Sequence, residues 1–132
     1  MKILMDDREP EGLVLMGEVE GMEFERKRLK VGDYVVGNVC VERKEINDFC
    51  SSLIDGRLKK QVVAMNDNYL HNFVLVSGKI GDRTSEVHEH SVLGMMASLI
   101  VKYGVNIVIL DDDGQLLYFM KRLFERYEEG VL

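Results

Sequence analysis

Asp33, Glu42 and Lys44 form the group of side chains whose types and spacing best suit phosphate chemistry in this sequence. Gly37-Asn38 lies midway between Asp33 and Glu42, and this dipeptide favours a two-residue turn between antiparallel strands. Such a hairpin places Asp33 opposite Glu42, and Lys44 lies on the same face because side chains in a strand alternate with a period of two. Facing carboxylates repel each other, and a hard divalent cation would relieve the repulsion by binding their oxygens.

The other face of the predicted hairpin supports the same register. The residues that alternate with the charged set are apolar, namely Tyr34, Val36, Val39 and Val41. A slip of one residue would bury the charges, so the pattern favours a single pairing. The alternative is an exposed hairpin with a surface ion pair between Glu42 and Lys44, which would contribute little stability. The spacing by itself leaves both interpretations open.

The motifs around this hairpin resemble those of one nuclease family in their order and spacing. In chain order they are Asp6-x-Arg8-Glu9, Val31-Gly32-Asp33-Tyr34, Val41-Glu42-Arg43-Lys44-x-x-x-Asp48, Ser52, Asp55-Gly56-Arg57-Leu58 and Gln61. Together they resemble the nuclease domain of XPF/Hef-type structure-specific endonucleases, an ERCC4-like domain. The motifs cover the first half of the chain, and the second half agrees only by its pattern of strands and helices.

The resemblance implies an α/β protein with a three-layer, restriction-endonuclease-like fold, in which helices flank a central mixed sheet. It also implies a metal-dependent endonuclease that hydrolyses phosphodiester bonds in branched DNA, such as flaps, splayed arms and forks, during DNA repair or replication-fork processing. One alternative is a catalytically silent scaffold of the same fold that binds DNA or a partner. Another is a different metal nuclease of this fold, such as a junction resolvase or a restriction enzyme.

The resemblance and the hairpin geometry together suggest roles for individual residues. Four side chains are expected to be catalytic, namely Asp6, Asp33, Glu42 and Lys44. The three acids and the backbone carbonyl of Arg43 would hold Mg²⁺ or Mn²⁺, and the lysine would stabilise the phosphate or orient the attacking water. Residues expected to contact DNA or to support the metal ligands are Arg8, Glu9, Arg43, Asp48, Arg57 and Gln61. Asp48 has a second interpretation as a structural helix-cap or hinge acid.

The composition is typical of one folded domain, with 46% hydrophobic and 30% charged residues in a chain of 132. We therefore expect a single nuclease domain over residues 1–132, without a helix-hairpin-helix or helicase domain. The net charge of −6 disfavours general nucleic-acid binding, because non-specific affinity comes from phosphate contacts by Lys and Arg. Only six of the seventeen Lys and Arg residues lie after residue 60, so a local basic surface near the motifs is expected.

Other patterns exclude several classes of site. The segment Ser77-Gly78-Lys79 lacks the first glycine of a phosphate loop, since Phe73 stands there, so we expect no nucleotide binding. The run His88-Glu89-His90 and the three acids at 111–113 are more typical of loops and helix caps than of metal sites.

The cysteines and the apolar runs bear on the compartment. Cys40 and Cys50 lack the spacing of a zinc site or a disulfide framework, which predicts free thiols. No apolar run is long enough to span a membrane, and the first residues are not a signal peptide. We therefore expect an intracellular protein that binds no membrane, cytoplasmic in a prokaryote or nuclear in a eukaryote.

Hydrophobic periodicity predicts alternating strands and helices. The expected strands cover 2–6, 22–29, the hairpin around 34–41, 72–76 and 105–110, and the expected helices cover 9–17, 46–54, 57–69, 90–103 and 114–127. The helix at 90–103 is apolar nearly all round between residues 92 and 100, which requires burial on two sides. The resemblance adds that domains of this family pair through their later helices and the strand between them.

We therefore expect a homodimer whose interface includes Met96, Ile100, Phe119 and Leu123. The alternative is that the helices at 90–103 and 114–127 bury their apolar surface within the core of one chain. Branched DNA is the expected substrate, and an additional protein partner could supply DNA affinity.

Overall fold

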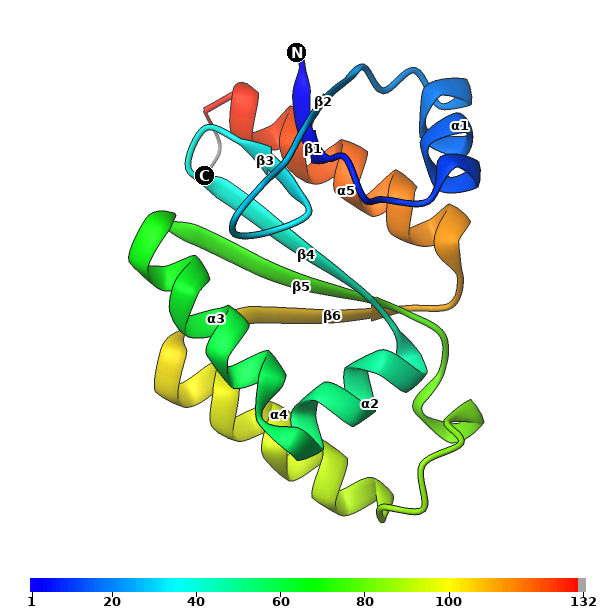
Figure 1. The fold of residues 1–132 in the computed structure, drawn as a ribbon, viewed down its shortest axis with the longest axis vertical. Helices are drawn as coiled ribbons and strands as arrows, with labels where there is room; N and C mark the ends of the chain where they lie inside the picture. The colour runs from blue at the N-terminus through cyan, green and yellow to red at the C-terminus, as the bar shows by residue number, and fades with distance from the viewer. Residues whose placement is uncertain (131–132) are drawn as a thin grey trace.

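The computed structural model describes residues 1–130 as a six-stranded mixed sheet with helices on both faces (Figure 1). The strands are β1 (Ile3–Asp6), β2 (Phe24–Lys27), β3 (Tyr34–Val36), β4 (Val39–Glu45), β5 (His71–Ser77) and β6 (Asn106–Leu110). The helices are α1 (Glu11–Val19), α2 (Ile46–Asp55), α3 (Arg57–Asn68), α4 (Glu89–Tyr103) and α5 (Asp113–Glu128), and a 3₁₀ turn spans Ile80–Asp82. The predicted three-layer α/β fold with a mixed sheet is confirmed.

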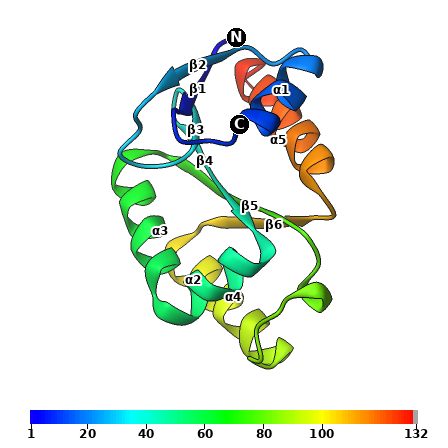
Figure 2. The ribbon, with the colours of Figure 1, turned by 45° about the vertical axis from the view of Figure 1, so that its right-hand side comes forward.

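Different helices cover the two faces of the sheet (Figure 2), and a large cluster of buried apolar residues lies on each face. Helices α1 and α5 cover one face, where Tyr34 and Leu75 belong to the same buried cluster as Leu116 and Phe124. Helices α2, α3 and α4 cover the other face, where the neighbours of Leu75 in β5, Val74 and Val76, are buried. Strand alternation thus places neighbouring strand residues on opposite faces of the sheet, and a smaller third cluster holds Val35 of β3 and Cys40 of β4. None of the helices within residues 1–130 is long and apolar enough to cross a membrane.

The strand order is β2-β1-β3-β4-β5-β6, and β3 is antiparallel to both of its neighbours while the other pairs are parallel. The hairpin has the predicted register, with Tyr34 opposite Val41 and Val36 opposite Val39. Gly37 in the turn has a positive φ of 55°. The turn is held by α5, because the Asn38 backbone N–H donates to the Tyr127 hydroxyl at 3.1 Å.

Strand β4 continues beyond the hairpin. Its partner β3 pairs with it over Val39–Val41, whereas β5 pairs with it along the whole of Val39–Glu45. Within the described residues, the second half of β4 therefore has a neighbouring strand on one side only. On the other side its backbone groups are free to bind side chains. Strand β2 is shorter than predicted, because it pairs with the four-residue strand β1 and with no other strand.

Gly32 gives a test of how the backbone before β3 is constrained. It has a φ of 81°, and a Cβ atom there would collide with the Cys40 sulfur. Gly21 has a similar φ of 85° with nothing within 4 Å of a Cβ. We expect Gly21→Ala to cost about 1 kcal/mol from backbone strain alone. Gly32→Ala should cost about 3 kcal/mol, because overpacking adds to the same strain. Urea unfolding measures both, and equal losses would contradict the contact with Cys40.

Candidate active site

A polar pocket of about 440 Å³ opens where β1 ends, beside the free edge of β4. Six of the residues predicted from the motifs line it, namely Asp6, Arg8, Glu9, Asp33, Glu42 and Gln61. These residues come from the turn after β1, the loop before β3, strand β4 and helix α3. The fold thus brings together side chains that are up to 55 positions apart in the sequence, from Asp6 to Gln61.

Asp33 is held in the pocket by three hydrogen bonds. Its backbone N–H donates to the Val41 carbonyl at 2.8 Å, and its carbonyl accepts from the Asp6 N–H at 2.8 Å. Its side-chain Oδ2 accepts from the Arg43 backbone N–H at 2.8 Å. That N–H is available because β3 begins only at Tyr34, opposite Val41, so the Asp33 carboxylate takes the place of a strand partner on β4.

Glu42 lies beside Asp33 and is 92% buried, with a relative exposure of 8%. Burial raises the pKa of Glu42 to about 9, and the charge of Asp33 and a hydrogen bond with it act in the same direction. Lys44 lowers this pKa, but by less than the other effects raise it. The pair therefore holds a proton more readily than two separate carboxyl groups would, and that proton relieves the repulsion between them.

The Arg43 backbone presents a further oxygen to this pair. In an extended strand the N–H and the C=O of one residue point to the same side. Since the Arg43 N–H donates to Asp33, its carbonyl also faces the free edge of β4. Two carboxyl groups, once the proton that they hold is released, and a carbonyl provide hard oxygen donors of the kind that Mg²⁺ and Mn²⁺ prefer.

Gln61 supports the presence of a hydrated ligand in this pocket. Its Oε1 atom is buried and has no hydrogen-bond partner among the described residues. An acceptor that is buried without a donor is costly, so a donor is expected in the space that it faces. The water molecules of a hydrated divalent cation are donors. The residues present therefore fit such a cation.

The Arg43 side chain has a different role from its backbone. Its guanidinium binds Glu9, with Nε to Oε1 at 2.9 Å and Nη2 to Oε2 at 3.1 Å, and both side chains are largely buried. Glu9 is itself tied to the end of β1, because its N–H donates to the Asp6 carbonyl at 3.1 Å. Arg43 and Glu9 thus link β4 to β1 beside the carboxyl groups of Asp33 and Glu42. In this conformation Glu9 engages the Arg43 guanidinium, and whether Arg43 contacts DNA stays a prediction.

The Asp6 carboxylate accepts its hydrogen bonds from donors of the protein itself. Its Oδ2 accepts from Arg8 Nε at 2.8 Å, and its Oδ1 accepts from Arg8 Nη2 at 3.2 Å and from the Leu29 N–H at 3.0 Å. Burial raises the pKa of Asp6. The hydrogen bonds from Arg8 and Leu29 together lower it by more, so the pKa of Asp6 is below its ordinary value. Among residues 1–130 no three His, Cys, Asp or Glu side chains converge on one point. A metal role for Asp6 requires Arg8 to move away.

Besides Arg43, three predicted residues do not line the pocket. Lys44 is half-buried on the free edge of β4 and close enough to Glu42 to lower its pKa. Arg57 is exposed and binds Asp55 at 2.7 Å. Asp48 is exposed in the first turn of α2. The alternative of Asp48 as the cap is wrong, because Glu45 is the cap residue and accepts from the Asn47 N–H at 3.3 Å.

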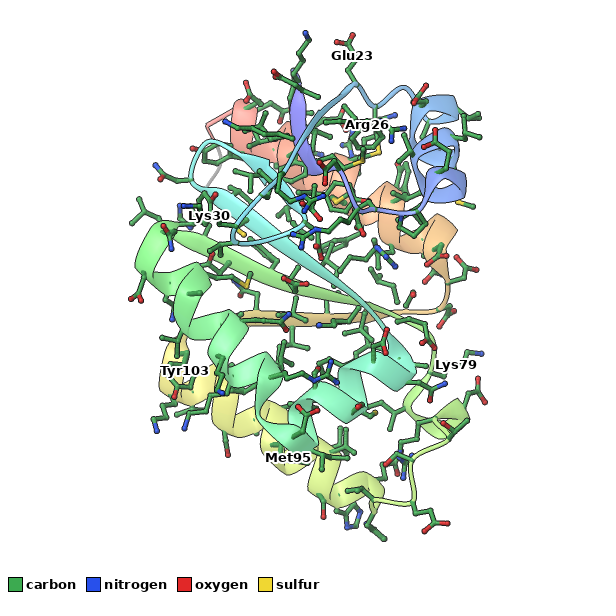
Figure 3. The ribbon with its side chains drawn as sticks, in the orientation of Figure 1. Glu23, Arg26, Lys30, Lys79, Met95 and Tyr103 are labelled. Carbon is green, nitrogen blue, oxygen red and sulfur yellow. The ribbon has the colours of Figure 1, made fainter. Side chains whose placement is uncertain are left out.

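The predicted basic surface is partly neutralised. Arg26 pairs with Glu11 at 2.7 Å and Arg28 with Asp7 at 2.6 Å. Lys27 and Lys30 are exposed and form no ion pair within the described part of the chain, and Lys30 lines the pocket from the loop between β2 and β3 (Figure 3). The sequence reasoning missed Leu29, which acts on Asp6 through its backbone N–H. No side-chain signal could reveal such a contact.

Comparisons with known proteins agree with this geometry. The ERCC4 domain family matches residues 5–123. The chain is 28% identical over 133 residues to the 3′-flap repair endonuclease Xpf of Saccharolobus solfataricus, covering 98% of this chain and 57% of that protein. It is 35% identical over 109 residues to a Methanocaldococcus jannaschii protein named as an ATP-dependent RNA helicase, covering 82% of this chain and 13% of that one.

A solved structure of XPF from Aeropyrum pernix in complex with DNA resembles the fold with a TM-score of 0.90 at 28% identity. The match covers 98% of this chain and 66% of that chain. The chain therefore spans only part of the length of each of these three relatives.

Glu42→Gln tests the repulsion within the acidic pair. A carboxyl whose pKa rises on folding stabilises the fold at low pH, and that stabilisation is lost as pH rises through the folded-state pKa. For Glu42 this window runs from 4.5 to about 9. We expect the metal-free variant to match the parent near pH 5 and to exceed its stability by on the order of 2 kcal/mol near pH 9.

Urea unfolding with EDTA across this range measures the effect. Glu18→Gln, which changes an exposed acid on α1, is the control. A parent and a Glu42→Gln variant with parallel stability profiles would show that Glu42 is not held in its protonated form.

Proposed function

Since the chain belongs to the ERCC4 domain family, we propose that it is a metal-dependent, structure-specific DNA endonuclease that hydrolyses phosphodiester bonds in branched DNA. The observation that carries the proposal is the pair formed by buried Glu42 and half-buried Asp33 beside the free edge of β4. A pair of carboxyl groups that repel each other has no evident structural use. It does suit a site that binds a cation and a phosphate.

The names of the relatives support DNA as the substrate. One is a 3′-flap repair endonuclease, and a second was solved in complex with DNA. In this chain Lys27 and Lys30 are exposed beside the pocket, and Lys44 lies on the adjoining edge of β4. We propose flaps, splayed arms or forks as substrates, in DNA repair or replication-fork processing. The scaffold alternative has less support, because every acidic residue of the motif is present.

The proposed mechanism assigns each group of the chain a task. Asp33, Glu42 and the Arg43 carbonyl would hold Mg²⁺ or Mn²⁺. The cation would lower the pKa of a water molecule and withdraw charge from the phosphate. Glu42 would release its proton on binding the cation. The ammonium group of Lys44 would stabilise the charge that develops on the phosphate.

The remaining groups of the pocket would support the metal ligands and Lys44. Gln61 Oε1 would accept a hydrogen bond from water and so orient it. The buried pair of Arg43 and Glu9 would keep the β4 backbone in place. These two residues therefore act through the backbone that holds Asp33, not on the phosphate itself.

We also propose a homodimer through the sheet edge formed by β6 and its flanking helices. Strand β6 is at the end of the sheet. On α4 Ile100 is 41% exposed and Val101 86% exposed. Met96 on α4 and Phe119 and Leu123 on α5 are half-buried. The described fold leaves this apolar surface uncovered, and a two-fold dimer would cover it with the same surface of a second copy. A separate protein partner would add DNA affinity.

Cleavage assays test the assigned roles. With flap, fork, four-way junction and duplex DNA, we expect Mg²⁺-dependent cutting of the flap and the fork. Asp33→Asn and Lys44→Ala should each reduce the rate on the order of 100-fold. Calorimetry with Mn²⁺ should show weakened binding for Asp33→Asn and nearly unchanged binding for Lys44→Ala, because an ammonium is not a metal ligand.

Two outcomes would contradict these assignments. A parent protein that cuts none of the four substrates with Mg²⁺ or Mn²⁺ would favour the scaffold alternative. Loss of Mn²⁺ binding in Lys44→Ala would indicate a structural role for Lys44.

Phe119→Glu tests the dimer. A charge at the centre of an apolar interface should convert the dimer to a monomer and shift the dissociation constant at least about 100-fold, since an unpaired charge is costly to bury. Sedimentation equilibrium at micromolar concentration measures the mass against the 15.1 kDa of one chain. Leu15→Glu, on exposed α1, is the control and should leave the mass unchanged. A parent chain that sediments as a monomer would reject the interface.

A further inference from the structure

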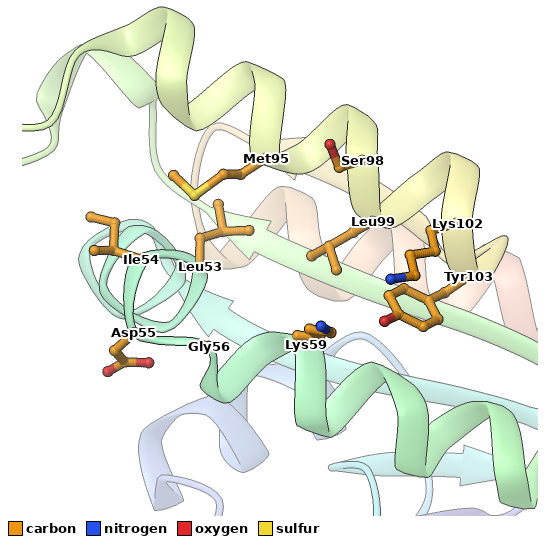
Figure 4. A pocket seen from close by; sticks show the side chains of 10 residues that line it. All are labelled: Leu53, Ile54, Asp55, Gly56, Lys59, Met95, Ser98, Leu99, Lys102 and Tyr103. Carbon is orange, nitrogen blue, oxygen red and sulfur yellow. The ribbon is translucent and has the colours of Figure 1, made fainter.

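An apolar groove of about 360 Å³ lies between the junction of α2 with α3 and the middle of α4 (Figure 4). Its lining residues include Leu53 and Ile54 from α2 and Met95 and Leu99 from α4. None of its lining residues belongs to the polar pocket or to the proposed dimer interface. It is therefore a third surface of the molecule, and the endonuclease proposal does not use it.

The groove exists because the helices separate at residues with small side chains. Gly56 ends α2 with a φ of 86° and starts α3 directly, and nothing lies within 4 Å of a Cβ there. Ser98 faces the same space from α4, with its hydroxyl bonded to the Gly94 carbonyl at 3.0 Å. Ile54 is left 46% exposed at the edge. A side chain from outside can therefore contact apolar atoms that the fold itself leaves uncovered.

The charges around the groove are unbalanced. Lys59 on α3 and Lys102 on α4 line it, and Lys102 Nζ lies 5.5 Å from the centre of the Tyr103 ring. Neither lysine forms an ion pair in the part of the chain that the structure describes. The acid in the groove, Asp55, is already bound by Arg57 at 2.7 Å. The groove thus presents two free positive charges on a chain with a net charge of −6.

We propose that this groove binds a short amphipathic segment of a partner protein. Large apolar side chains of the segment would lie between Leu53 and Leu99, and carboxylates on either side of them would pair with Lys59 and Lys102. An apolar surface with flanking charges is typical of grooves that bind amphipathic helices. DNA suits it less well, because phosphates bind charged and polar donors and most of the lining away from the two lysines is apolar. The complementary charge of the partner gives the segment its orientation.

Synthetic peptides provide the probe. The test peptide is a helix of about twelve residues with Leu at i, i+3 and i+7 and Glu on both flanks. A second peptide replaces each Glu by Lys, and a third replaces each Leu by Ala. Fluorescence anisotropy measures affinity for the full chain, and ¹H–¹⁵N correlation spectra locate the contact. We expect only the Glu–Leu peptide to bind, with shifts confined to residues 53–59 and 95–103.

Charge reversal makes the assignment specific. The double variant Lys59→Glu/Lys102→Glu should bind the Glu–Leu peptide at least tenfold more weakly and should now prefer the Lys–Leu peptide. Lys60→Glu is the matched control, because Lys60 is exposed on the same helix outside the groove. It should change affinity less than twofold. Ser98→Arg should also block binding by filling the groove, and its spectrum reports whether it folds.

Three outcomes would overturn the proposal. One is that all three peptides bind equally or that none binds. The second is that the chemical shifts of the groove amides change with the concentration of the protein in the absence of peptide, which would assign the groove to a second copy. The third is that a DNA duplex shifts the groove amides more than the peptide does. The test uses no cleavage, so it is independent of the endonuclease proposal.

Discussion

The late start of strand β3, at Tyr34, is the constraint on which the rest of the candidate site depends. Because β3 leaves β4 after Val41, the Arg43 N–H is free to bind the Asp33 carboxylate, and its carbonyl faces the same edge. A β3 longer by two residues would satisfy both groups with backbone partners and would exclude the carboxylate. An incomplete hairpin thus creates the polar edge, while β5 holds the same strand along its whole length.

Within residues 1–130, two of the four acids at the site, Asp6 and Glu9, are each paired with an arginine, whereas Asp33 and Glu42 are not. Arg43 neutralises Glu9 and Arg8 neutralises Asp6, in each case through two hydrogen bonds. Among the described residues Asp33 and Glu42 form no ion pair, and their repulsion, together with burial, raises the pKa of Glu42. The metal-free protein is therefore expected to carry strain that a cation would remove. Sites of this kind exchange some stability for function.

The layers of the fold separate three surfaces that could be occupied at the same time. The polar pocket lies beside β1 and the free edge of β4, the apolar groove lies among α2, α3 and α4, and the proposed dimer surface follows the β6 edge. A short chain of 132 residues has little surface to spare. Distinct surfaces for DNA, partner and second copy would let affinity be added without crowding the site.

The sequence by itself determined the hairpin register and the members of the acidic pair, because alternation and the Gly37-Asn38 turn are local. It also indicated the order of strands and helices and the family. Only the tertiary structure showed that Arg43 binds Glu9 and that the Leu29 N–H binds Asp6, since both contacts join distant segments. The positions of Asp48 and Arg57 outside the pocket were decided the same way. The direction of α2 and α3 after β4 follows from how they pack against α4, and no local pattern encodes that packing.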